Sequence, residues 1–280
     1  MNFQPKLKEV EMKNMVKNIC AAMVISLCAA GHLFATENNP NNDNKFMEEN
    51  LNLIQEWDKT FPQSDKVNHK KITFHNRYGI TLAADLYVPK NVTGKLPAIA
   101  ISGPFGAVKE QASGLYAQTL AERGFLTIAF DPSYTGESSG QPRYVASPDI
   151  NTEDFSAAVD YLSTRDDVDA ERIGILGICG WGGMALNAAA IDTRIKATVT
   201  ATMYDMSRVN ANGYFDSMNA DARHELRRQL NAQRTEDYRN GTFALGGGVV
   251  DPLPADAPQF VKDYHACLLY TSDAADERSS

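Results

Sequence analysis

Four short apolar runs that alternate with segments of helical spacing are the feature that most constrains this chain. The runs cover residues 96–102, 125–130, 173–178 and 195–201, and each is apolar almost throughout. Continuous apolar runs of this length are typical of strands buried on both faces, as in a parallel sheet. Strands and helices in alternation therefore predict an α/β domain, with a mostly parallel sheet and helices on both faces. Ligand sites of such sheets lie beyond the carboxyl ends of the strands.

The segments between these runs have helical spacing. We expect helices over 112–123, ended by Gly124, over 154–164, with Asn151 as N-cap, and over 180–190. Before the first run, residues 72–74 and 80–88 alternate in polarity around a Tyr78-Gly79 turn, which predicts an antiparallel pair. Residues 46–61 have weak helical spacing, and we expect an N-terminal helix there. Residues 206–266 carry a charged helical stretch at 218–239, which we interpret as a partial cap over the strand ends.

One cysteine lies at the junction of a predicted strand and a predicted helix, in Gly177-Ile-Cys179-Gly-Trp-Gly-Gly183. A strand-to-helix turn between small residues holds a nucleophile in a strained conformation with its side chain at the top of the sheet. The N-terminus of the following helix favours negative charge, and so a thiolate. We therefore predict that Cys179 is a catalytic nucleophile. The alternative is a structural cysteine that packs as a small apolar side chain.

A nucleophile of this kind works beside backbone donors that stabilise an oxyanion. The N–H of Gly180, directly after Cys179, is the first predicted donor. The second is expected from the loop after residues 96–102, which reads Gly103-Pro-Phe-Gly106. Because Pro104 has no N–H, we predict that Phe105 supplies it.

Three motifs together resemble the alpha/beta-hydrolase superfamily over about residues 71–266. They are Ser-Gly-Pro-Phe-Gly at 102–106, Phe-Asp-Pro-Ser-Tyr-Thr-Gly-Glu-Ser at 130–138, and the turn around Cys179. The branch they resemble contains dienelactone hydrolases, which also use cysteine, and Xaa-Pro-type serine peptidases. The chain departs from the superfamily at Trp181, where the motif usually has glycine. The resemblance implies an enzyme that cleaves an ester, lactone or thioester through an acyl-enzyme on Cys179. An amidase or peptidase and a non-catalytic binding protein of the same fold remain as alternatives.

The resemblance also implies that an acid and then a histidine follow the nucleophile along the chain. After Cys179 the histidines are His224, in a charged helical segment, and His265, with no predicted strand before it. Neither has the expected position. We interpret His69 and His75 as surface residues. Asp205 follows the last apolar run, but no further strand carries an acid. We therefore expect that the acid and histidine partners were lost to truncation, and that this chain is a poor catalyst.

Both ends of the chain differ in character from the middle. Lys13 and Lys17 precede an apolar run and Ala35, which together predict a signal peptide over 1–35. A membrane anchor or a lipoprotein site at Cys28 fits less well. Residues 36–45 are Asn-rich and are expected to be a linker. Residues 267–280 begin at Cys267 with a stretch that resembles the translation of a transposon-derived sequencing adapter, so we interpret them as an artefactual tail.

The remaining 231 residues, 36–266, comprise the predicted linker and one predicted domain, 46–266. Residues 1–35 carry four lysines and two acids, and residues 267–280 one arginine and three acids, so 36–266 keep the net charge of −8. This negative charge argues against nucleic-acid binding. No spacing of His, Cys and Asp predicts a metal site, and no cofactor motif is present. We expect a secreted or periplasmic enzyme with a small acyl substrate and without a stable membrane span after signal cleavage.

Overall fold

The structure, a computed structural model, describes residues 49–246, 253–259 and 261–262. The chain divides into two units, residues 1–45 and 46–280. The first unit lies wholly outside the described residues, as do the predicted signal peptide, linker and tail. The account below concerns the second unit.

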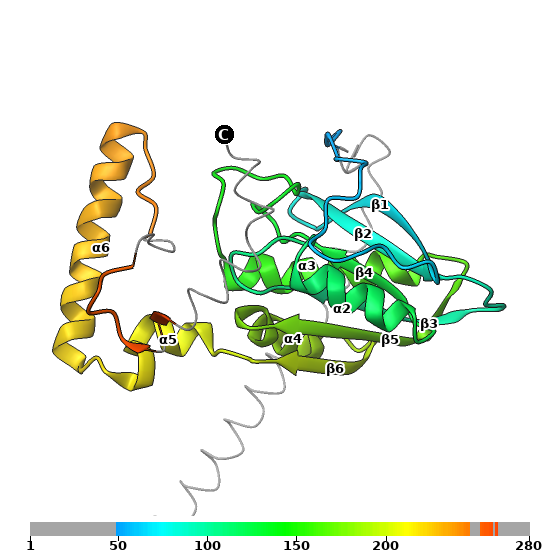
Figure 1. Cartoon of the computed structure of the whole chain (residues 1–280). Helices are drawn as coiled ribbons and strands as arrows, with labels where there is room; N and C mark the ends of the chain where they lie inside the picture. The colour runs from blue at the N-terminus through cyan, green and yellow to red at the C-terminus, as the bar shows by residue number, and fades with distance from the viewer. Residues whose placement is uncertain (1–48, 247–252, 260, 263–280) are drawn as a thin grey trace, which may run out of the picture. The chain divides into compact units, whose positions relative to one another are not determined.

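A six-stranded mixed sheet is the centre of this unit (Figure 1). Its strand order is β1-β2-β4-β3-β5-β6; the first three are joined in antiparallel pairs, and β4, β3, β5 and β6 run parallel. The strands are β1 Val67–His75, β2 Thr81–Pro89, β3 Leu96–Ser102, β4 Leu126–Phe130, β5 Val168–Ile178 and β6 Ile195–Ala201. The predicted antiparallel pair and all four predicted parallel strands are thus confirmed.

Three helices cover the two faces of the sheet. On one face, α3 (Pro148–Ser163) and α4 (Gly180–Ile191) pack on a core that includes Phe130, Phe155 and Leu162. On the other face, α2 (Ala112–Ala121) packs through Ala117 and Ala121 on a second core. The α/β class with helices on both faces, predicted from the alternation of apolar runs, is therefore confirmed.

Two local predictions are wrong. No helix is present over 49–61; this segment is extended and irregular, and the Nε1 of Trp57 donates to the Phe61 carbonyl (2.8 Å). α3 begins at Pro148, and its N-cap is Ser147, whose side chain accepts from the N–H of Ile150. Asn151 lies inside the first turn of the helix, where its Oδ1 accepts from the N–H of Ser147 (2.9 Å). Proline is well suited to this first helical position because its missing N–H has no partner there.

A short helix, a 3₁₀ turn and a long helix follow β6 within residues 206–240. α5 (Met206–Asn212) and a 3₁₀ turn, η1 (Tyr214–Asp216), precede the long helix α6 (Ala220–Asn240). α6 begins at the N-cap Asn219 and ends at the left-handed Gly241, as the charged pattern at 218–239 predicts within two residues. None of its side chains is buried. The interpretation of residues 206–266 as a cap stays a prediction.

We expect Leu162→Ala to lower the free energy of unfolding by about 2–5 kcal/mol, because it leaves a cavity in a fully buried site between α3 and the sheet. Leu230→Ala is the control, since Leu230 lies on α6 and is 58% exposed; we expect a change within about 0.5 kcal/mol. Urea titrations of both variants measure this, and equal losses would contradict the assignment of the core.

Candidate active site

Cys179 forms the turn between β5 and α4, in a backbone conformation that non-glycine residues rarely adopt. Its φ is 58° and its ψ is −126°. The N–H of Cys179 donates to the Ala201 carbonyl (2.8 Å), and its own carbonyl accepts from the N–H groups of Gly182 (3.0 Å) and Tyr204 (3.3 Å). β6 and the loop after it therefore hold the turn in place. Strained backbone of this kind persists only where surrounding structure enforces it, and it is concentrated at functional sites.

Glycines make room for this turn. A Cβ added to Gly177 would collide with the Trp181 carbonyl, and one added to Gly103, which has a φ of 98°, would collide with the Ile178 carbonyl. The loop after β3 and the turn at Cys179 are therefore packed directly against each other, backbone on backbone. The place that the sequence predicts for Cys179, on a tight strand-to-helix turn, is the place that the structure gives it.

The two predicted oxyanion donors lie side by side. A Cβ added to Gly180 would be 3.4 Å from the Cβ of Phe105. Neither N–H donates a hydrogen bond to another group in the part of the chain that the structure describes. The residues that carry the two predicted donors thus lie against each other, and Gly180 directly follows Cys179 in the chain. Met206, at the start of α5, covers Gly180 from the other side (3.0 Å from that Cβ position), a contact that the sequence does not reveal.

A cavity of about 550 Å³ opens beside Phe105 and Trp181. The two rings meet edge to face, with centroids 5.4 Å apart. The departure at Trp181 thus gives the cavity an aromatic wall. The remaining lining comes from residues 54, 106–110 and 135–146, at the carboxyl ends of β3 and β4. This is the end of the sheet at which the sequence predicts a ligand site.

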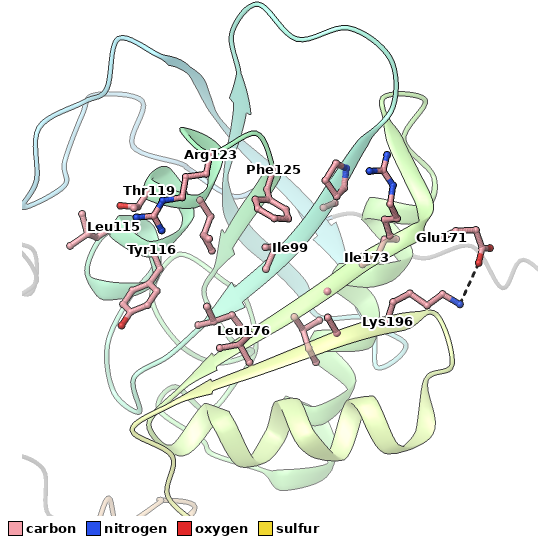
Figure 2. A pocket seen from close by; sticks show the side chains of 18 residues that line it. Ile99, Leu115, Tyr116, Thr119, Arg123, Phe125, Glu171, Ile173, Leu176 and Lys196 are labelled. Atoms are coloured by element: carbon pink, nitrogen blue, oxygen red, sulfur yellow. Dashed lines mark ion pairs between the residues drawn. The ribbon is translucent and has the colours of Figure 1, made fainter.

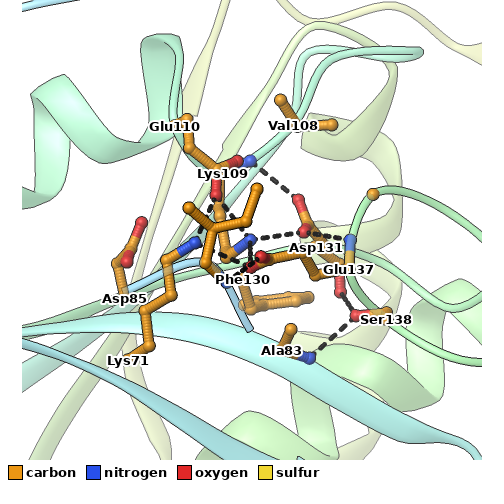
Figure 3. A network of polar contacts seen from close by, with 12 residues as sticks. Lys71, Ala83, Asp85, Val108, Lys109, Glu110, Phe130, Asp131, Glu137 and Ser138 are labelled. Carbon is orange, nitrogen blue, oxygen red and sulfur yellow. Dashed lines mark hydrogen bonds and ion pairs between the residues drawn. The ribbon is translucent and has the colours of Figure 1, made fainter. Parts of the chain in front are cut away.

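Two lysines with buried side chains and three carboxylates, two of which (Glu110 and Glu137) line this cavity, form what we call the lysine–carboxylate cluster: Lys71, Lys109, Glu110, Asp131 and Glu137 (Figure 3). The Nζ of Lys109 donates to Glu110 (2.7 Å), Asp131 (2.8 Å) and Glu137 (2.6 Å). The Nζ of Lys71 donates to Glu110 (3.1 Å) and Glu137 (2.8 Å). The cluster therefore joins the loop after β3 to the loop after β4.

The cluster is charged. Burial by itself would lower the pKa of Lys109, but the neighbouring Asp131, Glu110 and Glu137 outweigh it and raise that pKa well above its usual value. Burial would likewise raise the pKa of Glu137, but Lys109 and the N–H of Ile54 outweigh it and lower the pKa. The sequence motifs contain Asp131 and Glu137 but assign them no role. Their pairing with Lys109 depends on long-range packing.

The backbone of the loop after β3 is also fixed by this cluster. The N–H of Lys109 donates to Oδ1 of Asp131 (2.7 Å), whose Oδ2 accepts from the N–H of Glu137 (2.9 Å). Lys109 lies four residues after Phe105 in the same loop. Asp131 therefore positions the segment that carries the predicted oxyanion donor.

None of the histidines that the structure describes forms a hydrogen bond to Cys179. His224 is exposed on α6, as expected, and His265 lies outside the described residues. His69 is not the surface residue that the sequence suggests: its side chain is 9% exposed, and its Nε2 is 2.8 Å from Oδ1 of Asp85. The reason is that residues 57–61 cover this part of β1, and the His69 ring packs between Trp57 and Tyr87.

Over the described residues, no hydrogen bond reaches the Sγ of Cys179. Asp205 is exposed and caps α5, accepting from the N–H of Arg208 (2.9 Å). The same residues contain no group of three His, Cys, Asp or Glu side chains placed to hold a metal ion. None of the described helices has the length and apolar character needed to cross a bilayer.

Comparison with known proteins decides the family. The family model described as X-Pro dipeptidyl-peptidase (S15 family) matches residues 78–245. The chain belongs to this family. An alpha/beta hydrolase from Penicillium, GrgF, has the same fold, with a TM-score of 0.59 over 72% of this chain and 66% of its own at 21% identity. The chain is therefore a member of a hydrolase family with the alpha/beta-hydrolase fold.

Two relatives extend the comparison. The uncharacterized protein PA2218 of Pseudomonas aeruginosa is 60% identical over 88% of this chain and 65% of its own length. A crystal structure of hypothetical protein PA2218 superimposes with a TM-score of 0.77 at 64% identity, over 79% of this chain and 69% of that one. Thiohydrolase aneE of Aspergillus aculeatus is 29% identical over 49% of this chain and 42% of its own. The chain thus spans less than two thirds of the length of these curated relatives.

We expect Lys109→Met to lower the free energy of unfolding by about 3–5 kcal/mol, because it leaves buried carboxylates without their counter-charge. Lys70→Met is the matched control, since Lys70 is the exposed neighbour of Lys71 on β1; we expect a change within about 0.5 kcal/mol. Urea unfolding at neutral pH measures both. Equal stability of the two variants would contradict the role given to the cluster.

Proposed function

We propose that this hydrolase cleaves an ester, lactone or thioester by nucleophilic attack of Cys179. The observation that carries the proposal is the positive φ of Cys179 at the junction of β5 and α4, next to Gly180 and near Phe105, whose N–H groups donate to no other group within the described residues. A structural cysteine needs neither feature. The name of the thiohydrolase relative favours a thioester or another activated acyl group.

The chemistry follows from this arrangement. The Cys179 thiolate attacks the acyl carbon, and the carbonyl oxygen becomes an oxyanion that accepts from the N–H groups of Gly180 and Phe105. Collapse of this intermediate breaks the bond to the leaving group, which takes up a proton, and leaves the acyl group on Sγ. Water then hydrolyses this thioester and regenerates the thiol. The cavity at Phe105 and Trp181 is suited to hold the acyl chain.

The second half of this reaction needs a base that activates water. Within the described ranges, no histidine or carboxylate is bonded to Cys179. We therefore propose that the chain accepts an acyl group faster than it releases it. A peptidase is the second candidate, because the family model is described as an X-Pro dipeptidyl-peptidase. Amides are less reactive than thioesters and activated esters, so the rates on ester and amide substrates distinguish the two candidates.

Export is a further part of the proposal. The basic and apolar sequence of residues 1–35 supports a signal peptide and a periplasmic or secreted location. Fractionation of cells expressing the full chain tests it, since a processed product in the periplasm or medium is the expected result. An unprocessed chain retained in the cytoplasm would refute export.

Incubation with p-nitrophenyl acetate tests the catalytic step. We expect release of about one equivalent of p-nitrophenol, followed by slow turnover, because a thioester forms readily and no base is bonded to Cys179. Peptide mapping by mass spectrometry is expected to locate the acetyl group on Cys179, and Cys179→Ala to abolish both signals. Hydrolysis unaffected by Cys179→Ala would refute the nucleophile. An X-Pro amide tests the peptidase candidate in the same assay. That candidate predicts release of the leaving group from the amide rather than from the ester.

The oxyanion donors have their own test. Phe105→Pro removes the N–H that we assign to the oxyanion hole, and we expect the rate of Cys179 acetylation to fall about 10²–10³-fold. Phe105→Ala keeps the N–H and removes only the ring, so it is the matched control. Acetylation rates from rapid-quench mass spectrometry measure the difference. Similar rates for the two variants would place the donor elsewhere.

A further inference from the structure

Three aromatic residues line the cavity at the carboxyl ends of β3 and β4: Phe105, Tyr144 and Trp181. Trp181 is 4% exposed and forms a fixed wall, against which the Phe105 ring packs edge to face. Phe105 is 37% exposed and Tyr144 is 72% exposed, so both keep accessible side-chain surface. Trp181 lies two residues after Cys179. The Cβ of Phe105 is 3.4 Å from the position that a Cβ of Gly180 would take, so the cavity adjoins the turn that carries Cys179.

A second cavity, of about 640 Å³, lies elsewhere. It is found between Leu115 and Tyr116 of α2 and Lys196 of β6 (Figure 2). None of the three aromatic residues named above lines it. It runs alongside Ile99 and Ile173 in the strands, whereas ligands of such sheets bind beyond the carboxyl ends of the strands. The cavity with the three aromatic residues is therefore the better place for a group that reacts at Cys179.

Tyr144 is held in a backbone conformation that a tyrosine rarely adopts. Its φ is 64°. The N–H of Tyr144 donates to the Tyr134 carbonyl (2.9 Å), and the guanidinium of the neighbouring Arg143 donates to the Gly136 carbonyl (2.7 Å). Burial of the ring does not offset the cost of this conformation, because Tyr144 is exposed. Strain of this kind is concentrated at functional sites, which points to a role for the ring in the cavity.

The charged groups in the lining of the cavity already have partners. Glu110 and Glu137 accept from both lysines of the lysine–carboxylate cluster. The guanidinium of Arg143 donates to the carbonyls of Gly136 and Ser138. The apolar part of the lining, besides the three aromatic residues, includes Ile54, Val108, Val145 and Ala146. An uncharged apolar group therefore fits this cavity better than an ionised one, whose desolvation would gain no new counter-charge.

The size of the cavity and the nature of its walls narrow the choice further. A volume of about 550 Å³ is in the range of pockets that hold a drug-sized ligand, so an acetyl group would fill only a small part of it. Aromatic rings attract one another in edge-to-face and offset arrangements beyond what the burial of their area contributes. Walls made of aromatic rings therefore favour an aromatic ring over a saturated ring of the same size.

We propose that Phe105, Tyr144 and Trp181 form a binding site for an aromatic ring in the acyl group of the substrate, and that Tyr144 is its specificity-determining residue. Trp181 and Phe105 form the walls nearest the turn at Cys179, and Tyr144 forms the outer wall. The inference rests on the proposed function for the reaction at Cys179, whereas binding of the ring needs no covalent step.

Acylation of Cys179 in the full chain by three p-nitrophenyl esters tests the site. The phenylacetate has an aromatic ring, the cyclohexylacetate has a saturated ring of similar size, and the acetate has none. We expect the phenylacetate to acylate Cys179 about 2–10-fold faster than the cyclohexylacetate. Tyr144→Gly is expected to lower the ratio of the phenylacetyl rate to the acetyl rate about fivefold or more. Equal rates with the two ring esters would overturn the proposal, as would an unchanged ratio in Tyr144→Gly.

The same variant also tests for a purely structural role of Tyr144. Glycine adopts a positive φ without steric cost, so Tyr144→Gly is expected to preserve the melting temperature while it lowers the ratio of rates. A structural tyrosine predicts the reverse, and that result would contradict the proposal. Phe215→Gly is the matched control, because Phe215 has a φ of 57°, is 89% exposed and does not line the cavity. We expect it to leave the ratio unchanged.

Calorimetric titration of Cys179→Ala with phenylacetamide measures binding of the ring without any reaction. We expect a dissociation constant of about 1 mM or tighter, weaker binding of cyclohexylacetamide, and a severalfold loss of phenylacetamide affinity when Tyr144→Gly is added. This binding, without acylation of Cys179 by any of the esters, would refute the proposed function but support the ring site. Similar acylation by all three esters, without binding of phenylacetamide, would support the nucleophile and overturn the ring site.

Discussion

The turn at Cys179 depends on the pairing of β5 with β6. The Cys179 N–H continues the ladder of this pair by donating to Ala201, the last residue of β6, and the Cys179 carbonyl accepts from Tyr204 just beyond it. These bonds hold a non-glycine residue at a φ of 58°, which by itself costs free energy. The strained turn, the start of α4 and the adjacent loop after β3 thus all rely on one pair of parallel strands.

The lysine–carboxylate cluster has a comparable role for the second half of the site. A buried ion pair contributes little net stability compared with apolar side chains of similar volume, whereas the loss of one partner is costly. Its value here is geometric. Lys109, in the loop after β3, and Asp131, directly after β4, fix the loop that carries Phe105 relative to β4, and so place its predicted donor N–H. Gly103 completes this placement, because only a glycine lets that loop approach the carbonyl of Ile178.

The sheet and the tight turn at Cys179 were both predictable because their signals are local. The apolar runs of β3 and β6 coincide with the strands residue for residue, and Cys179 is flanked by glycines as its backbone requires. The predictions for residues 49–61 and for the start of α3 failed for two different reasons, one tertiary and one local. Weak helical spacing around Trp57 was overridden by packing against β1, and a Ser-Pro pair outcompeted Asn151 as the start of α3.

The sequence by itself thus determined the α/β class, the antiparallel first pair with parallel strands after it, and the position of Cys179 and Gly180 at the start of a helix. These follow from the period of apolar residues and from the conformational freedom of glycine, which act within a few residues. Only the tertiary structure decided that Phe105 lies against Gly180, that Lys109 is paired with Asp131, and that His69 is buried against Asp85. Those features join segments 16 to more than 70 residues apart, and no local pattern encodes which charges or rings will meet once the sheet has formed.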